Sequence, residues 1–466
     1  MAGVAQLRHD TAVIRDATLA AIGPERLVAR QLGCAAGRLV VAGGPGLSVL
    51  AGRIAIVGGG KAAAGMAAGV AALLAAGGVG PGRLVGLVSV PAGCGRDVAG
   101  VEIRETRPVA ENLPTTAVVA ATREMLALLE ALTPADLAIA VISGGGSALL
   151  EAPRAGVSLE ETIAVTAFLS AAGAGITELN AVRRAASDVK GGGLARACGA
   201  GGMLVLVISD VIGDPLEFIA SGPCLPGAAA ATTALAVLER FGATGVAPGL
   251  TAVLRAEAAC RDPGSESADV SSPGSWTTPR GCRVEHVLLG SNATAVEAAA
   301  AAAAALGYRV TIRPAVAGVP ETAEDAGRRL AREGLAMVAA AAADGRPRAI
   351  IEGGEAVVRL PADHGRGGRN QQTVAAALAE ASHAGGWPPG LLVASIGTDG
   401  EDGPTEAAGG LADEAVAARI GGLRLDAAAA VARCDAQPLL EQAGGLVVTG
   451  PTGTNVADVR IVLVRP

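Results

Sequence analysis

The sequence predicts an α/β protein of two domains, and three observations carry that prediction. Short runs of Val, Ile and Leu alternate with alanine-rich helical segments, which is typical of a parallel sheet with crossover helices. At 466 residues, the chain is longer than one typical domain. Hydrophobic residues make up 51% of it, yet only three Phe, one Tyr and two Trp contribute, so alanine supplies much of the predicted core.

Three buried strands are expected in the first half of the chain, in the runs RIAIVGGG, LAIAVISGGG and MLVLVISD. Each run ends in glycine or an acidic residue. Ligands of open α/β sheets bind beyond the carboxyl ends of the strands, so we expect these three ends to lie near one another. A second set of strands is expected in HVLLGSN, RAIIEGGE, GLLVASIGTDG and GLVVTGPTGTN.

A segment rich in Ser, Pro and Gly separates the two sets of strands. It spans Cys260 to Cys282 and has no apolar periodicity, so we expect a solvated loop or linker there. The predicted domains are residues 1–245 and 282–466, with residues 246–281 as the linker. A cleft between two α/β domains is a frequent place for a small-molecule site, and we expect the active site in that cleft.

The composition argues against several classes of protein. The formal net charge of −7 does not suit a nucleic-acid-binding protein, which would show a basic domain or stripe. The seven cysteines form no C-x-x-C pair, which indicates reduced thiols rather than a disulfide framework or a zinc site. No segment resembles a secretory signal or a membrane span. We therefore expect a cytoplasmic protein without nucleic-acid or membrane partners.

The stretch VGGGKAAAG places Lys61 where a glycine turn becomes a helix. A cation at a helix N-terminus is repelled by the helix dipole unless an anion lies between them. A P-loop would require Ser or Thr after the lysine. Gly58, Gly60 and Ala63 fit the dinucleotide fingerprint, but its acidic residue is missing. Glycines that only let the strand turn tightly are the structural alternative, whereas Lys61 favours an anion site.

The run ISGGGSALL follows the second predicted strand. The backbone N–H groups of Gly144, Gly145 and Gly146 are expected to converge on an anion. The hydroxyls of Ser143 and Ser147 lie beside them in the sequence. A simple tight loop is the alternative. A serine hydrolase is disfavoured, because the chain has no usable G-x-S-x-G elbow and contains only four histidines.

Two further motifs of the first half carry charge. Arg183 and Lys190 lie seven residues apart, so we expect them to share a helix face, with a solvated basic face as the alternative reading. Asp210 ends a predicted strand, and Asp214 follows within a turn. Two carboxylates at a strand end suit magnesium, although they would equally suit capping of the next helix.

Polar loops recur in the second half of the chain. The glycine-flexible loop DHGRGGRNQQ offers Arg366 and Arg369, whose guanidinium groups suit bidentate recognition of carboxylate or phosphate. Polar residues in two other loops are Asp399 and Asp402 in IGTDGEDGPT, and Thr452, Thr454 and Asn455 in TGPTGTN. Solvated turns are the ordinary reading of such loops. Their recurrence at strand ends favours a binding site.

The order of these motifs resembles that of the MOFRL-class glycerate 2-kinases. The resemblance rests on GGGKAA, SGGGSALL, GRGGRNQ, GTDG-DGPT and TGPTGTN, and it spans nearly the whole chain. It implies a Rossmann-like N-terminal domain with a parallel sheet, a distinct α/β C-terminal domain of the MOFRL type, and an active site between them. The implied activity is transfer of the γ-phosphoryl group of ATP to the 2-hydroxyl of D-glycerate, with a divalent metal such as Mg²⁺.

The resemblance also implies roles for individual residues. The family's essential lysine matches Lys61, and its essential arginine falls in the loop that holds Arg366 and Arg369, which leaves open which of the two it is. Our hypothesis makes Asp399 the general base or hydroxyl orienter. The residues expected at the metal are Asp210 and Asp214. Those expected at the nucleotide are Gly59, Gly60, Ser143, Gly144, Gly145, Gly146, Ser147, Arg183, Lys190, Thr452 and Asn455.

The chain departs from the family pattern at four positions. Arg107 and Ala185 stand where histidines are expected, Glu352 where serine is frequent, and Ala293 where arginine is common.

The alternatives to a kinase are a nicotinamide-dependent hydroxypyruvate reductase and a non-catalytic module that binds a sugar acid. The sequence leaves open the exact hydroxy acid and the oligomeric state, a homodimer included.

Overall fold

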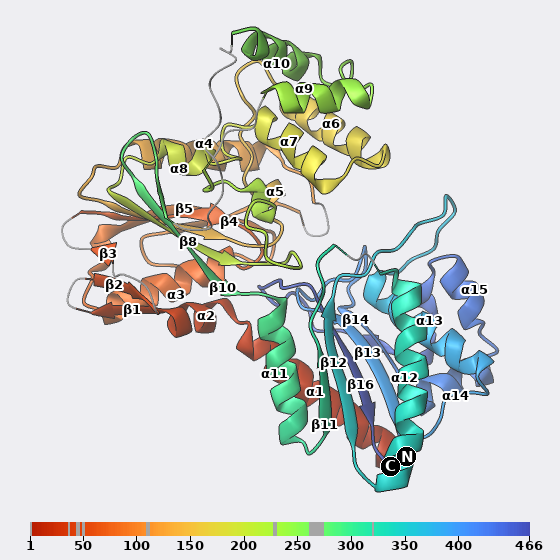
Figure 1. Ribbon diagram of the computed structural model, residues 1–466. Helices are drawn as coiled ribbons and strands as arrows, with labels where there is room; N and C mark the ends of the chain where they lie inside the picture. Colours follow the sequence, from red (N-terminus) through yellow and green to blue (C-terminus); the bar gives the residue numbers. More distant parts are fainter. Residues whose placement is uncertain are drawn as a thin grey trace. The chain divides into compact units, whose positions relative to one another are not determined.

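The computed structural model describes residues 2–35, 38–42, 47–48, 52–108, 112–226, 231–260, 275–318 and 321–466. These residues divide into two compact units, and both are α/β (Figure 1). Unit 1 comprises Met1–Gly23, Asp210–Gly213 and Gly290–Pro466. Unit 2 comprises Pro24–Ser209 and Asp214–Leu289. The predicted α/β class is confirmed.

Unit 2 is built on a seven-stranded sheet with the order β6-β5-β4-β7-β8-β10-β9. Five neighbouring strands run parallel: β4 (Ile54–Gly59), β5 (Leu84–Pro91), β6 (Glu102–Arg107), β7 (Leu137–Ile142) and β8 (Gly202–Ile208). Every residue of β4 and β7 is buried. Continuous apolar strands of this kind are typical of parallel sheets that are covered on both faces.

The ends of β4, β7 and β8 lie side by side, because these strands are neighbours in the sheet. Gly59 of β4 pairs with Ile142 of β7, and Ile142 pairs with Val207 of β8. The predicted proximity of the three strand ends is therefore confirmed. The run HVLLGSN was expected in the second set of strands, and that expectation is wrong. Its strand β10 (Arg283–Gly290) belongs to this first sheet, beside β8 and the short β9 (Trp276–Thr277).

The other elements of unit 2 include a small antiparallel sheet of β1 (Leu32–Ala35), β2 (Arg38–Val41) and β3 (Leu47–Ser48). Unit 2 also contains five helices that are interspersed in the chain with the strands: α2 (Pro24–Gln31), α3 (Ala63–Ala76), α4 (Thr116–Glu130), α5 (Gly146–Leu149) and α8 (Gly193–Ala197). Two 3₁₀ turns are η1 (Pro81–Arg83) and η2 (Ile219–Ser221). Four further helices share a separate apolar core: α6 (Leu159–Ala171), α7 (Ile176–Ala186), α9 (Ala231–Arg240) and α10 (Pro248–Cys260).

Unit 1 is built on a six-stranded sheet with the order β11-β12-β16-β13-β14-β15. Its strands are β11 (Arg309–Arg313), β12 (Arg348–Gly354), β13 (Leu391–Gly397), β14 (Gly409–Ala412), β15 (Leu446–Val447) and β16 (Asp458–Val464). Only the pair β11–β12 is parallel, and the remaining described neighbours are antiparallel. The run GLVVTGPTGTN was expected as one strand, but it contains only the two-residue β15.

Helices cover both faces of this sheet (Figure 1). One face carries α12 (Ala323–Asp344) and α13 (Arg369–His383), and the other carries α1 (Ala2–Ala21) and α11 (Asn292–Ala305). Helices α14 (Glu414–Leu423), α15 (Ala427–Ala432) and α16 (Ala436–Ala443) complete the unit. A Cβ atom added at Gly327 would overlap the carbonyl oxygen of Thr373, so α12 and α13 are in close backbone contact. Such contacts account for a core that is rich in small residues.

The division into units differs from the linear domain boundaries that we predicted. Helix α1 belongs to unit 1, where Asp10 accepts hydrogen bonds from Tyr308 (2.6 Å) and Arg465 (2.9 Å). Residues 248–260, predicted as part of the linker, form α10 of unit 2. Residues 261–274 of the predicted linker lie outside the described residues.

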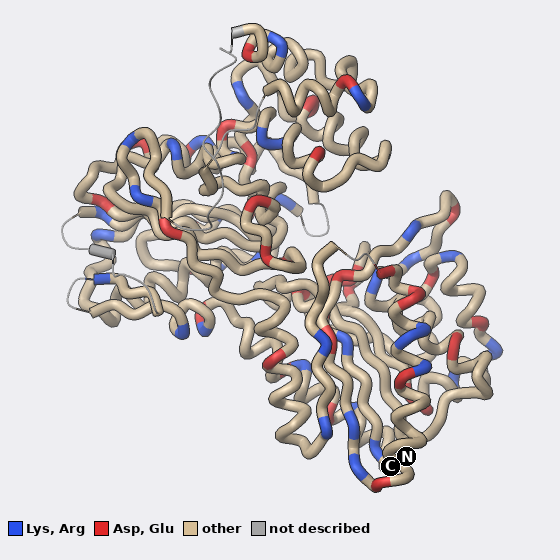
Figure 2. The backbone as a smooth tube through the Cα atoms, viewed as in Figure 1, with Lys and Arg blue, Asp and Glu red and all other residues tan. Residues whose placement is uncertain are grey.

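Basic and acidic residues are interspersed along the backbone of both units (Figure 2). Among the described helices, none combines the length and the apolar character needed to cross a bilayer.

Candidate active site

Two glycine-rich loops at the ends of β4 and β7 are joined by hydrogen bonds. The amide of Lys61 donates to the carbonyl of Gly144 (2.9 Å), and the amide of Ala62 donates to Oγ of Ser143 (3.0 Å). Ser143 in turn donates its own amide to the carbonyl of Gly59 (3.4 Å). The first amides before α3 are therefore used inside the protein, and the Ser143 hydroxyl ties the two loops together.

Two basic side chains flank the glycine loop that follows β7. A Cβ atom built on Gly145 would lie 3.4 Å from Nη2 of Arg107 and 3.7 Å from Cγ of Lys61. Gly145 has a φ of 76°, a conformation that favours glycine. Within the part of the chain that the structure describes, the amides of Gly144 and Gly145 donate to no other residue. Adjacent N–H groups beside two cations form a site suited to a phosphate.

Arg107 was noted in the sequence only as a departure from a family pattern. It is the last residue of β6 and is 5% exposed. Its Nη1 donates to the carbonyl of Pro108 (3.1 Å). Nothing in its local sequence indicates its proximity to Gly145, because β6 and β7 are separated in the sheet by β5 and β4.

The hydroxyl of Ser147 belongs to a small polar chain. Its Oγ lies 3.2 Å from Oγ of Ser221, which donates to Oδ1 of Asn180 (2.9 Å). Since the Ser221 proton is directed to Asn180, Ser147 is the donor in the hydroxyl pair. The backbone at Ser221 has a φ of 61°. Neither Ser221 nor Asn180 was among the site residues predicted from the sequence.

Lys61 and Lys190 are the two lysines of the chain, and their environments differ. Lys61 is half-buried. Lys190 is fully buried, and its Nζ donates to Oε2 of Glu151 and to the carbonyl of Leu150, both at 2.7 Å. Burial lowers the pKa of Lys190. Glu151 therefore already neutralises the ammonium that we expected at the nucleotide.

The predicted shared helix face of Arg183 and Lys190 is wrong. Helix α7 ends at Ala186, and Lys190 follows in the turn before α8. Arg183 lies in the last turn of α7, where it is half-buried, and burial lowers its pKa.

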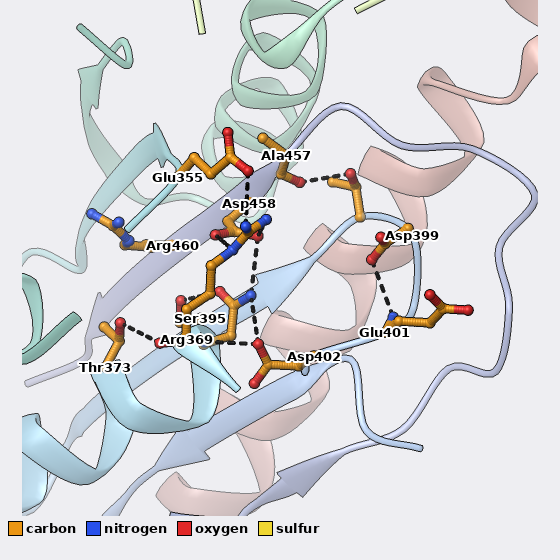
Figure 3. A network of polar contacts seen from close by, with 12 residues as sticks. Glu355, Arg369, Thr373, Ser395, Asp399, Glu401, Asp402, Ala457, Asp458 and Arg460 are labelled. Atoms are coloured by element: carbon orange, nitrogen blue, oxygen red, sulfur yellow. Dashed lines mark hydrogen bonds and ion pairs between the residues drawn. The ribbon is translucent and has the colours of Figure 1, made fainter. Parts of the chain in front are cut away.

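In unit 1, Arg369 at the start of α13 is held by two carboxylates (Figure 3). Its Nε and Nη2 donate to the two carboxylate oxygens of Asp458 (2.7 and 3.0 Å), and its Nη1 donates to Glu355 (2.8 Å). Asp458 begins β16 and is 1% exposed. Burial opposes the charge of Arg369, but the two carboxylates hold its pKa above the ordinary value. Arg369 is thus fixed in place by protein groups.

Arg366 differs from Arg369 in every one of these respects. Its side chain is exposed, and its guanidinium forms no ion pair with any described carboxylate. Its hydrogen bonds involve the backbone: the amide donates to Oδ1 of Asp435 (3.0 Å), and the carbonyl accepts from the amide of Gln437 (3.0 Å). Of the two arginines, Arg366 is therefore the one whose guanidinium is available to a ligand.

The two aspartates of IGTDGEDGPT also have different environments (Figure 3). Asp402 is buried, and its carboxylate accepts the amides of Asn370 (2.9 Å) and Gln371 (2.8 Å) in the first turn of α13. Burial raises the pKa of Asp402 to about 6. Asp399 is half-buried, and its Oδ1 accepts the amide of Glu401 (3.1 Å). Asp402 stabilises the start of a helix, which leaves Asp399 as the more accessible carboxylate.

The loop TGPTGTN brings Asn455 to Asp210. Nδ2 of Asn455 donates to Oδ2 of Asp210 (3.3 Å), and Oγ1 of Thr452 donates to the carbonyl of Thr398 (2.7 Å). Of the two predicted metal ligands, Asp210 is grouped with unit 1 and Asp214 with unit 2. The described residues contain no group of three or more His, Cys, Asp or Glu that could hold a metal ion.

Glu352, another departure from the family pattern, is part of a buried ion network. It is 3% exposed and accepts from Arg329 (2.8 Å) and from Arg460 (2.8 Å). Ala185, which stands in place of a histidine, is 2% exposed in the core of unit 2. Both residues contribute to the internal packing of their units.

Comparison with known proteins gives consistent results along the chain. Residues 10–255 match a domain of unknown function, DUF4147, and residues 348–458 match the MOFRL family. The chain is 36% identical to a glycerate kinase of Bos taurus, over 88% of this chain and 84% of that protein. It is 35% identical to a D-glycerate 2-kinase of Thermotoga maritima, over 74% and 76% of the two chains. A crystal structure of a Thermotoga maritima glycerate kinase superposes with a TM-score of 0.78 at 30% identity, covering 98% of this chain and 99% of that one.

Two α/β units with cation-bearing glycine loops at their strand ends, together with these relatives, define a phosphotransferase. The chain belongs to the glycerate kinase family, as its identity to these relatives over most of its length shows.

Proposed function

We propose that the protein transfers the γ-phosphoryl group of ATP to the 2-hydroxyl of D-glycerate, which gives 2-phospho-D-glycerate and ADP. The observation that carries this proposal is that the side chains of Lys61 and Arg107 both lie close to Gly145, in the loop where the amides of Gly144 and Gly145 donate to no other described residue. The glycerate kinase names of the relatives support the same reaction.

Phosphoryl transfer depends mainly on alignment and on neutralisation of charge. In unit 2, Lys61 would bind the transferred phosphoryl group, and the Gly144 and Gly145 amides would bind its oxygens. In unit 1, Arg366 would bind the carboxylate of glycerate or the equatorial oxygens of the moving group. Asp399 would orient the 2-hydroxyl and accept its proton. Arg369 would support this loop as a positioning residue, because Asp458 and Glu355 already occupy its donors.

Magnesium is compatible with one of the two predicted ligands. Mg²⁺ is commonly bound by one or two carboxylates together with the phosphates of the nucleotide and several waters. Asp210 is half-buried and accepts a hydrogen bond from Nδ2 of Asn455 (3.3 Å), and a partly accessible carboxylate suits such a role. A bound Mg²⁺ would neutralise phosphate charge, and Asp210 would hold it.

A homodimeric state and a cytoplasmic location stay predictions.

The proposal is tested by incubating the purified protein with Mg-ATP and, separately, D-glycerate, L-glycerate or hydroxypyruvate. We expect ADP release with D-glycerate and a phosphorus NMR signal of 2-phosphoglycerate. ADP release without an added acceptor, or 3-phosphoglycerate as the product, would contradict the proposed reaction.

The reductase alternative is not supported. The relatives are kinases, and β5, the strand after the glycine loop and α3, ends at Pro91 without the acidic residue that binds a nicotinamide ribose. Absence of NADH oxidation with hydroxypyruvate is the expected result.

A further inference from the structure

A polar cavity of about 810 Å³ lies within unit 2. It is bordered by α4, α8 and residues near the ends of α7 and α10, and none of its lining residues belongs to the Lys61 or Ser143–Ser147 loops. Its lining contains six basic side chains against three carboxylates. The basic residues are Arg123, Arg154, Arg184, Lys190, Arg196 and Arg280.

Three of the six cations are neutralised by carboxylates. Arg123 pairs with Asp188 (3.0 Å), and Arg154 pairs with Glu257. Lys190 is paired with Glu151 in the core, as described above. The lining contains three carboxylates, of which Asp188 and Glu257 belong to these pairs. The third is Glu130.

The other three cations contact backbone carbonyls instead. Nε of Arg184 donates to Ser221 (3.3 Å), and Nη1 of Arg196 donates to Gly191 (2.8 Å). Arg280 donates to the last residues of α8 and α4, at 3.2 and 3.4 Å. No described carboxylate lies within ion-pair distance of any of these three guanidinium groups. Burial lowers the pKa of both Arg184 and Arg196, so their charges are only partly compensated.

We propose that this cavity binds a small phosphorylated anion, such as a phosphate ester or pyrophosphate, through Arg184, Arg196 and Arg280. A guanidinium group binds phosphate through two parallel N–H donors, and carbonyl contacts fix these side chains while leaving other N–H groups for a ligand. The volume lies in the range of small-molecule sites. The lining contains few large apolar side chains, which disfavours a hydrophobic ligand.

The experiment is isothermal titration calorimetry of the full chain with the substitution Lys61→Ala, which weakens anion binding at the loop proposed for catalysis. The probes are 2-phosphoglycerate, pyrophosphate and inorganic phosphate, with succinate at equal ionic strength as a dianion without phosphorus. We expect at least one phosphorylated probe to bind more tightly than succinate, and the strongest probe identifies the ligand class. Turnover is not measured, so the result does not depend on the proposed kinase reaction.

The variant Arg196→Gln/Arg280→Gln is expected to weaken that binding tenfold or more. The matched control is Arg255→Gln, because Arg255 is exposed on α10 and does not line the cavity. Thermal unfolding midpoints verify that each variant is folded. If the double variant unfolds, Arg280→Gln replaces it with the same criterion, since Arg280 is exposed. Equal binding of succinate and the phosphates, unchanged affinity after loss of the cavity arginines, or equal weakening by Arg255→Gln would overturn the proposal.

Discussion

Oγ of Ser143 accepts a 3.0 Å hydrogen bond from the backbone amide of Ala62, and this contact joins the ends of two neighbouring parallel strands. Both residues are 0% exposed. A buried N–H group that loses its acceptor costs about 1–3 kcal/mol, because it has given up water without a replacement. The Ser143 hydroxyl therefore stabilises the loop that carries Lys61.

We expect Ser143→Ala to lower the free energy of unfolding of unit 2 by about 1–3 kcal/mol. The measurement is urea unfolding in a Trp387→Phe background, where Trp276 of unit 2 is the remaining tryptophan. Ser170→Ala, on the exposed surface of α6, is the matched control and should change little. Equal stability of the Ser143 and Ser170 variants would contradict a structural role for this hydroxyl.

Substitution of Arg366 should lower activity without lowering stability, and substitution of Arg369 should lower stability. Arg366→Gln is expected to lower kcat/KM about 100-fold while the unfolding midpoint stays unchanged, because the exposed guanidinium has no carboxylate partner. Arg369→Gln should lower stability by about 3–5 kcal/mol, because the buried Asp458 loses its counter-charge. Steady-state kinetics and urea unfolding of a Trp276→Phe background, with Trp387 as the reporter of unit 1, measure both. The reverse pattern would assign the ligand to Arg369.

The buried pair Lys190–Glu151 should show strong coupling. Lys190→Met alone leaves Glu151 buried without its cation and is expected to cost about 3–5 kcal/mol. The double variant Lys190→Met/Glu151→Gln should recover part of that loss, because no isolated buried charge remains. A double-mutant cycle by urea unfolding measures the coupling, and additive losses would show that the two groups act independently.

The buried imidazole of His286 should make the stability of unit 2 depend on pH. Burial lowers its pKa to about 4, below the ordinary value of 6.5. Between pH 6.5 and 4 the unfolded chain binds a proton that the folded chain does not, so stability is lost as the pH falls through this window. One titrating group contributes at most about 1.4 kcal/mol per pH unit. Compared with the wild type, His286→Gln should have a smaller decrease in unfolding free energy between pH 7 and pH 4.5, and an identical decrease would refute the assignment.

The parts of the site that the sequence predicted are those governed by local pattern. Buried apolar runs that end in glycine predict strands, and parallel pairing places the ends of β4 and β7 together. The contact of Ala62 with Ser143 follows from that adjacency. The position of β10 was missed because its run, HVLLGSN, carries no signal for the sheet that it joins.

The parts that the sequence could not predict depend on partners distant in the chain. Lys190 lies 39 residues from Glu151, and Arg369 lies 89 residues from Asp458. No local pattern distinguishes a lysine that meets a buried carboxylate from one that meets a ligand. For the same reason, the sequence could not distinguish Arg366 from Arg369. In the structure, carboxylates neutralise Arg369, whereas Arg366 is exposed.

The most direct test of the proposed reaction is kcat of Lys61→Ala with Mg-ATP and D-glycerate. Lys61 lies beside the glycine loop whose Gly144 and Gly145 amides donate to no other described residue, and the other lysine of the chain, Lys190, is buried against Glu151. Loss of an interaction made mainly in the transition state should lower kcat by roughly 100-fold or more, with unchanged unfolding of unit 2. A kcat close to that of the wild type would contradict the assignment of this loop to the transferred phosphoryl group.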